Sequence, residues 1–243
     1  MDSGRVYGYR KVHHDLCDLG ESCSRYRVAR LMRSRGWRAQ VGYRRRPGFH
    51  GGIPHNVAAN ILDRQFDVAA PNIAWVTDIT YIRTHEGWLY LAVVLDLFSR
   101  QVVGWSMDSR MSKDLVLQAL LAAVWRRKPK QRVMVHSDQG SQYVSIRYSD
   151  RLSEAGINPS VGSTGSAYDN ALAETINGLY KAEVIHRRAP WKTKAAVELA
   201  TLEWVAWFNH QRLLGSIGDV PPAEAEERYY RQLAAPAADP VLL

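Results

Sequence analysis

The chain has 243 residues, 46% of them hydrophobic, and a formal net charge of +8. This length allows one large domain, or one with a small satellite. No run of 18 apolar residues occurs and the first residues contain no apolar segment, so the sequence predicts neither a transmembrane helix nor a secretory signal. Two cysteines, Cys17 and Cys23, are too few for a disulfide framework or a four-ligand zinc site, and they are typical of a reducing cytoplasm.

The positive charge is concentrated at the start of the chain. Residues 1–50 contain twelve Lys or Arg and four acidic residues, a difference equal to the whole net charge, whereas residues 51–243 contain twenty of each. A basic block ahead of a neutral body predicts a polyanion-binding arm, although a solvated helix face would give the same pattern. Its candidate phosphate contacts are Arg44, Arg45 and Arg46.

Two short helices are expected in this basic region, residues 1–46. The first covers 10–19, and the second begins after Ser24 as its N-cap and ends at Gly36. Two helices joined by a Gly-Glu-Ser turn resemble a DNA-binding helix-turn-helix fragment. The alternative is a helical hairpin that packs on the following domain. Residues 47–70 are rich in Gly, Pro and His and are predicted to be a linker.

The main domain, residues 71–225, is predicted to open with three strands. Apolar and β-branched runs cover Ala74–Arg83, Trp88–Asp96 and Val102–Met107, and the turns between them are short. Short turns indicate antiparallel neighbours. A helix with apolar residues at helical spacing follows, from Ser112 to Trp125.

Two further strands and two helices complete the predicted domain. The strands are Val133–Val135 and a short one near Asn158–Val161, and the helices are Asp169–Val184 and Thr193–His210. This order is that of the ribonuclease H-like fold, an α/β fold with a five-stranded mixed sheet flanked by helices. Residues 226–243 are expected to form a C-terminal tail.

Three acidic residues are the candidate catalytic centre. Asp138 comes 60 positions after Asp78, and Glu174 comes 36 positions later. Asp78 interrupts a strand fit for burial, Asp138 ends another, and Glu174 lies in a helical pattern, so the three can converge on a pair of hard divalent cations that activate a nucleophile toward a phosphodiester. Such spacing also arises by chance among 24 acidic residues. Asp96 is the main rival, as a strand-end cap or a further support of the site.

A resemblance adds to this reading. The chain resembles, from about residue 7 to about residue 222, the catalytic (OrfB-type) subunit of transposases of the insertion-sequence-three family, which are DDE transposases related to retroviral integrases. The motifs that carry it, in chain order, are YGYRKV (7–12), RVARLMRSRGW (27–37), WVTDITYI (75–82), GWLYLAVVLDLFSRQVVGWSM (87–107), VHSDQGSQY (135–143), GSAYDNALAETINGLYKAEV (165–184) and WFNHQR (207–212).

The resemblance implies a DDE transposase that catalyses Mg²⁺-dependent cleavage and strand transfer at the ends of an insertion element. Asp78, Asp138 and Glu174 would be both the catalytic residues and the ligands of two Mg²⁺ ions, with Mn²⁺ as a substitute. Asp78 would bridge the ions. Lys181 lies two helical turns after Glu174, and in the resembled family a basic residue at this offset contacts the terminal DNA; the alternative is a solvated lysine paired with Glu183 or Asp150. The alternatives to an active transposase are a catalytically silent fragment that binds DNA ends, and a nuclease that cuts without joining.

Other polar residues near the acids are candidate DNA contacts. Gln139 follows Asp138 in a polar loop suited to phosphate or base contact. Asn170 and Asn177 lie one helical turn from Glu174, so they either orient its carboxylate or touch DNA. His136 is equally consistent with support of the site and with an ordinary strand histidine.

Tryptophans and arginine runs are assigned mainly to structure. Core packing is expected for five tryptophans, and only Trp75, near Asp78, is expected to have access to substrate. The five are Trp88, Trp105, Trp125, Trp204 and Trp207. The basic runs 126–128 and 187–188 either track phosphates or are simply solvated.

The expected partners are double-stranded DNA, both element ends and target, and further copies of the chain on that DNA. No heptad repeat is present. The resemblance therefore implies a helix-turn-helix partner or fusion subunit encoded upstream, in a bacterial cytoplasm and at the nucleoid when DNA is bound. The block Asn209–Gly215 lacks the Pro-His pair common in the resembled family, which indicates a different subgroup.

Overall fold

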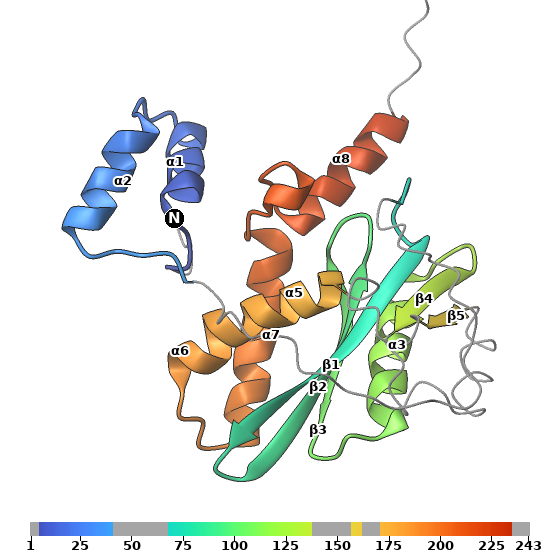
Figure 1. Ribbon diagram of the computed structural model, residues 1–243. Coiled ribbons are helices and arrows are strands. Elements are labelled where there is room, and N and C mark those ends of the chain that lie inside the picture. The colour runs from blue at the N-terminus through green and yellow to red at the C-terminus, as the bar shows by residue number, and fades with distance from the viewer. Residues whose placement is uncertain (1–4, 41–67, 138–156, 162–170, 235–243) are drawn as a thin grey trace, which may run out of the picture.

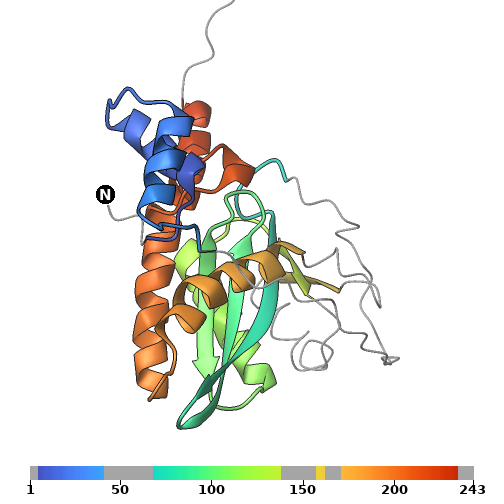
Figure 2. The same ribbon diagram turned by 60° about the vertical axis from the view of Figure 1, so that its left-hand side comes forward.

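A computed structural model describes residues 5–40, 68–137, 157–161 and 171–234 of the chain. Figure 1 shows a twisted sheet with helices on both faces and a separate pair of N-terminal helices beside it. Figure 2 shows the same pair next to the upper end of the longest C-terminal helix. In the described part of the chain, no helix is long and apolar enough to cross a membrane.

The sheet has five strands in the order β3-β2-β1-β4-β5. Strands β1 (Ala74–Thr84), β2 (Gly87–Asp96) and β3 (Val102–Asp108) are antiparallel neighbours, as their short turns predicted. Strands β4 (Val133–Ser137) and β5 (Ile157–Val161) run parallel to β1. The predicted five-stranded mixed sheet is therefore confirmed.

Alternation along the strands produces a separate hydrophobic core on each face of the sheet. Helix α3 (Lys113–Arg127) covers one face, while α5 (Ala171–Tyr180) and α7 (Lys194–His210) cover the other. Helix α3 lies very close to β3, because a Cβ atom at Gly104 would be only 2.3 Å from the backbone oxygen of Ala119. Glycine is required at this point of contact.

Helix α5 does not continue as a regular α-helix to Val184, as the sequence predicted. It passes into a π-helical turn, Lys181–Ile185, and then into α6 (His186–Arg188). The wider turn has four consecutive buried residues, Ala182 to Ile185. Among them Glu183 is 4% exposed. Its carboxylate accepts hydrogen bonds from the Arg212 guanidinium, at 2.6 Å for the shortest, and from the Trp204 indole at 2.9 Å. A buried carboxylate needs such partners.

The block after Asn209 joins three parts of the molecule. The Asn209 side chain accepts a hydrogen bond from the Val102 backbone N–H and donates one to the Val102 carbonyl, both at 2.9 Å. Arg212 pairs with Glu183 of the π-turn. Leu213 packs against the N-terminal segment. The block Asn209–Gly215, which lacks the Pro-His pair of the resembled family, therefore has a structural role.

Helices α1 (Tyr9–Asp18) and α2 (Arg25–Ser34) form the predicted N-terminal pair, and Ser24 caps α2 by accepting a hydrogen bond from the Arg27 N–H. The segment before α1 is tied to the core. The Leu213 N–H donates to the Tyr7 hydroxyl at 2.7 Å, and the Lys11 ammonium donates to the Leu213 carbonyl at 2.5 Å. Burial, and secondarily Arg212, lowers the pKa of Lys11. The helix pair thus also packs on the main domain, as the alternative interpretation proposed.

The last described helix is α8 (Pro222–Ala234). It begins before residue 226, where the C-terminal tail was predicted to start, and continues past it. Glu226 is buried and forms an ion pair with Arg127. The Arg127 guanidinium also donates to the side chains of Asn72 at 2.8 Å and Gln101 at 3.0 Å. Arg127, assigned to a basic surface run, is therefore a structural residue that holds α8, because its donors are used within the fold.

Candidate active site

Asp78 lies in the middle of β1, on the face of the sheet that α5 covers. Its neighbour across β2 is Val93, and the preceding residue, Thr77, pairs with Ser137 at the end of β4. The Asp78 side chain is half-buried. Asp138 directly follows Ser137 in the chain and lies outside the described residues.

Helix α5 is tied to Asp78 by one side chain. The Asn177 amide donates a hydrogen bond to Asp78 Oδ2 at 2.9 Å, and Asp78 Oδ1 accepts one from the Ile79 backbone N–H at 2.8 Å. Asn177 is only 6% exposed. Of the two roles considered for Asn177, this contact matches orientation of a carboxylate, but the carboxylate is that of Asp78 rather than Glu174.

Glu174 precedes Asn177 by three residues on α5 and is exposed. Residues at this spacing share a side of a helix. The contact between Asn177 and Asp78 therefore places the predicted glutamate beside the strand that carries the first predicted aspartate. Within the described ranges no group of three or more metal-binding side chains is found, and the third predicted carboxylate, Asp138, lies outside those ranges. The oxygen donors of Asp78 and Glu174, reachable from solvent, fit a hard divalent cation.

Asp96, the rival aspartate, has a different environment. It is fully buried. Its Oδ1 accepts hydrogen bonds from the Phe98 and Ser99 backbone N–H groups and the Ser99 hydroxyl, and its Oδ2 accepts one from the Asn72 N–H at 2.7 Å. These four bonds cap the end of β2. Asp96 is therefore the strand-end cap that the sequence allowed, because its oxygens face inward and are occupied.

Lys181 begins the π-turn after α5 and is half-buried. Its ammonium lies 4.6 Å from the centre of the Tyr81 ring, on the same strand as Asp78. Glu183, one possible partner of Lys181, is instead held by Arg212. A cation–π contact of this kind helps to hold a lysine side chain in place.

Three of the tryptophan predictions are wrong. Trp75 is completely buried in the core under α3, because neighbouring strand residues face opposite sides of the sheet and Asp78 is three positions away. It has no access to substrate. Trp88 and Trp125, expected in the core, are 43% and 78% exposed. Strand β2 extends past the helices that cover the sheet, and Trp125 lies on the outer side of α3.

Several predicted contacts fall outside the described residues. They are Asp138, Gln139, Asn170, Arg44, Arg45 and Arg46. His136 is described and is completely buried on β4, opposite Val76. Burial removes His136 from direct contact with DNA.

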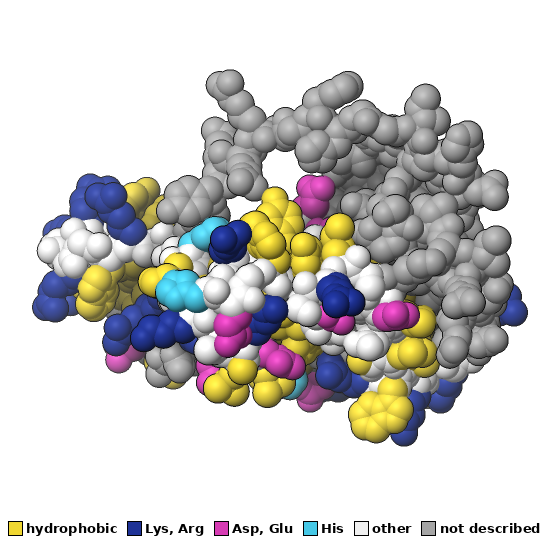
Figure 3. All heavy atoms as spheres, turned by 90° about the horizontal axis from the view of Figure 1, so that it is seen from below, with side chains coloured by type: hydrophobic (Ala, Val, Ile, Leu, Met, Phe, Trp, Pro, Cys, Tyr) yellow, Lys and Arg dark blue, Asp and Glu magenta, His cyan; other side chains and the backbone are white. Residues whose placement is uncertain are grey.

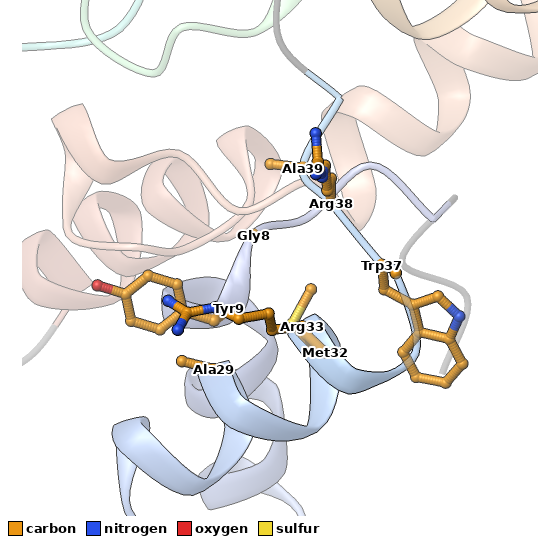
Figure 4. Close-up of a pocket in the computed structure, with 9 residues that line it drawn as sticks. Gly8, Tyr9, Ala29, Met32, Arg33, Trp37, Arg38 and Ala39 are labelled. Carbon is orange, nitrogen blue, oxygen red and sulfur yellow. The ribbon is translucent and has the colours of Figure 1, made fainter.

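The N-terminal helices enclose a cavity of about 430 Å³ beside exposed basic side chains. Figure 4 shows Met32 and Arg33 of α2 and the segment with Trp37 and Arg38 around it, with Arg33 extended toward Tyr9. Trp37 is 63% exposed. The arginines of α2 are exposed, so the region presents positive charge at its surface.

Comparisons with known proteins agree with this geometry. Models described as an integrase core domain match residues 68–167 and 155–222, and a model described as an HTH-like domain matches residues 1–47. The putative transposase for insertion sequence element IS986/IS6110 of Mycobacterium tuberculosis (strain H37Ra) is 46% identical over 96% of this chain and 86% of that protein. The chain belongs to the insertion-sequence-three family of transposases.

Other relatives of this transposase chain are consistent with the assignment. The transposase for insertion sequence element IS629 of Shigella sonnei is 47% identical over 96% of this chain and 77% of that protein. A solved structure of a simian T-cell lymphotropic virus intasome in complex with PP2A regulatory subunit B56 gamma has a TM-score of 0.54 and 17% identity, over 91% of this chain and 73% of that chain. That likeness concerns the fold alone, and it confirms the integrase-like core.

Some features of this transposase site were not foreseen from its sequence. The Glu183–Arg212 pair was missed because the two residues are 29 positions apart and no local pattern links them. The contact between Lys181 and Tyr81 was also missed, because the two residues are far apart in the sequence and no local pattern links them.

Proposed function

We propose that Asp78, Asp138 and Glu174 are the catalytic residues of this transposase, and that they act together in DNA strand cleavage and strand transfer at the ends of an insertion element. The observation that carries the proposal is the hydrogen bond from Asn177 to Asp78. It fixes the helix of Glu174 against the strand of Asp78, and β4, which ends one residue before Asp138 in the sequence, pairs with that strand.

The carboxylates would hold two Mg²⁺ ions, with Mn²⁺ as a substitute, because carboxylate oxygens are the ligands such cations prefer. When bound, the ions supply charge stabilisation and a nucleophile at neutral pH. Asp78 would contribute one carboxylate, and the Asn177 amide would hold its Oδ2 in place. Glu174 would contribute another, since its side chain is exposed. Serine, cysteine and tyrosine nucleophiles are not needed for this chemistry.

The DNA contacts would lie on both sides of these acids. Lys181, held beside Tyr81, would bind a phosphate of the terminal DNA. Gln139 and Asn170 stay predictions for DNA contact, and so do Arg44, Arg45 and Arg46 of the basic arm. Asn177 is better assigned to positioning Asp78, because it is buried.

The partners would be the element ends, the target DNA, further copies of the chain and an upstream-encoded helix-turn-helix subunit. The HTH-like match and the exposed arginines of α2 support DNA binding. The site of action would be the bacterial cytoplasm, at the nucleoid when DNA is bound.

A cleavage and joining assay tests the proposal. The substrate is duplex DNA ending in the terminal repeat that flanks the coding sequence, with Mg²⁺ and with the upstream subunit supplied if required. Asp78→Asn, Asp138→Asn and Glu174→Gln should each abolish cutting and joining while DNA affinity stays near that of the parent. Asp114→Asn, an exposed acid at the start of α3 on the other face, is the control and should stay active.

Substantial activity in a triad variant would remove that residue from the site. A parent that binds ends without cutting is the silent fragment, and one that cuts without joining is a nuclease.

A further inference from the structure

Four side chains form a continuous row beside the candidate site, and we name this row the hairpin ladder. Its members are Lys181, Tyr81, Trp88 and Arg83. The Lys181 ammonium is 4.6 Å from the Tyr81 ring centre, the Tyr81 and Trp88 ring centres are 5.6 Å apart with the rings edge to face, and the Arg83 guanidinium is 5.1 Å from the Trp88 ring centre. The row therefore has a cation at each end and two aromatic rings between them.

The strand register explains why the row forms. Arg83 and Trp88 are directly opposite each other in the β1–β2 pair, and Tyr81 is two residues before Arg83 on the same face. Tyr81 and Trp88 are thus diagonal cross-strand neighbours, which aromatic side chains can bridge. Lys181 joins the row from the π-turn. Tyr81 is three residues after Asp78, so it lies about 10 Å along the strand from the candidate catalytic aspartate and its side chain leaves the opposite face of the sheet. Lys181 therefore links the row to the face that carries Asp78.

Exposure makes the ladder more than a packing contact. Tyr81 is 50% exposed and Trp88 is 43% exposed, and Arg83 is also exposed. The acidic residue of the hairpin turn, Glu86, accepts a hydrogen bond from the Lys194 N–H, and so faces α7. Figure 3 views the molecule from the side to which this hairpin turn points, and there basic, acidic and hydrophobic side chains lie interspersed on the surface. Two adjacent aromatic rings at the surface are typical of an interaction site.

We propose that the hairpin ladder binds the phosphate backbone of the DNA whose end lies at the candidate site. The proposal rests on the proposed function and extends it from Lys181 to Arg83, Tyr81 and Trp88. The two rings hold the two cations in defined places, so that less side-chain freedom is lost when phosphates bind. Charge complementarity selects a polyanion, and Lys181 connects the ladder to the helical segment that carries Glu174.

The expected contact is independent of base sequence, because phosphates carry no sequence information. In this arrangement Tyr81 and Trp88 are positioning residues for Lys181 and Arg83. A purely structural aromatic pair would stabilise the hairpin and leave the salt dependence of DNA binding unchanged.

The test measures binding of fluorescent duplex DNA over a range of salt concentrations, with one duplex ending in the element's terminal repeat and one of unrelated sequence. Arg83→Gln should reduce the slope of log K against log salt by about 0.9 for both duplexes, the value for one phosphate contact. Arg132→Gln is the matched control, since this exposed arginine precedes β4 at the opposite end of the β1–β4 pair, and its slope should equal that of the parent.

A second pair of variants addresses the rings. Trp88→Ala should weaken binding of both duplexes, while Trp88→Phe, which keeps a ring under Arg83, should retain most of the affinity.

An Arg83→Gln protein that is folded, as judged by circular dichroism, and binds with the parent's slope overturns the ladder even if Trp88→Ala fails to fold. Loss confined to the terminal repeat overturns the phosphate assignment. If the parent cleaves the repeat duplex but the Arg83 variant matches it, only this inference fails. A parent that neither binds nor cleaves that duplex contradicts the proposed function instead.

Discussion

Asp78 and Asp96 lie on adjacent strands of one sheet and have opposite environments. Asp96 is fully buried, and its oxygens accept four hydrogen bonds from Asn72, Phe98 and Ser99. Asp78 is half-buried and is positioned by the amide of Asn177 from a facing helix. Both interrupt or end apolar strands, so the sequence pattern alone does not separate them. The difference shows that a fully buried carboxylate with four hydrogen bonds serves the fold, whereas a half-buried one positioned by a facing helix is a candidate for chemistry.

The same contrast recurs along one helical segment. Glu174 of α5 is exposed, whereas Glu183 of the π-turn is 4% exposed and ion-paired with Arg212. The two glutamates are nine positions apart. The change of helix type between them accompanies a change of role from candidate ligand to structural anchor.

The largest expected effect on activity comes from a substitution of Asp78. Asp78→Asn should lower strand-transfer activity by a factor of about 10³ or more, because a ligand that positions metal charge is lost. The free energy of unfolding, measured with urea, should stay within about 0.5 kcal/mol of the parent or rise, as is usual for a substitution that does not touch the core. A large loss of stability would mean that Asp78 belongs with Asp96.

Arg212→Met tests the structural role of the buried Glu183–Arg212 ion pair at the π-turn. Removing one partner of a buried ion pair should cost about 3–5 kcal/mol in the free energy of unfolding, since Glu183 is left buried without its cation. The double variant Glu183→Gln with Arg212→Met should recover part of this loss. A single variant as stable as the parent would show that the pair contributes little to the fold.

Asp96→Asn tests the strand-end cap. An amide cannot accept all four hydrogen bonds, and hydrogen bonds to a charged group contribute about 1.5–3 kcal/mol each. We expect a loss of roughly 2–3 kcal/mol in urea unfolding, with normal activity per folded molecule at low temperature. Activity lost in a protein of parental stability would instead place Asp96 among the metal ligands.

Asn177→Ala should have an intermediate effect that is confined to the site. Residues that orient a metal ligand typically affect metal affinity or activity by about 10- to 100-fold. The variant should therefore require a higher Mg²⁺ concentration for half-maximal activity, while DNA affinity measured without Mg²⁺ stays parental. Weaker DNA binding with an unchanged Mg²⁺ dependence would support the DNA-contact role considered from the sequence.

The smallest effect concerns Tyr180, the last residue of α5, whose hydroxyl shares a 2.5 Å hydrogen bond with Thr201. Burial raises the pKa of Tyr180 above its ordinary value. The unfolded chain ionises this group near pH 10 while the folded protein keeps it protonated, so stability is retained below that pH and falls above it. Tyr180→Phe should reduce this alkaline loss by up to about 1.4 kcal/mol per pH unit. Identical pH profiles for the two proteins would contradict the shift.

Much of the fold could be predicted from local patterns. Turn length predicted the antiparallel order of β1, β2 and β3, and the sequence predicted Ser24 as the cap of α2, where it accepts a hydrogen bond from the Arg27 backbone N–H. The spacing of acidic residues and the family motifs pointed to Asp78 and Glu174, and the structure brings their strand and helix together through Asn177. Such features depend on neighbours a few positions away, which a sequence displays directly.

Only the tertiary structure decided which polar groups serve the fold. Asp96 became a cap because the Asn72 N–H reaches it across 24 positions, and Arg127 became an anchor for α8 because Glu226 reaches it across 99. The π-turn coincides with a buried ion pair to a residue 29 positions away, and Trp88 is exposed because its hairpin runs beyond the helices. Hydrogen bonds and burial between distant segments have no signature in local periodicity. The amino-acid sequence therefore determined the elements and the candidate acids, while long-range packing determined which of the acids face solvent and which complete the core.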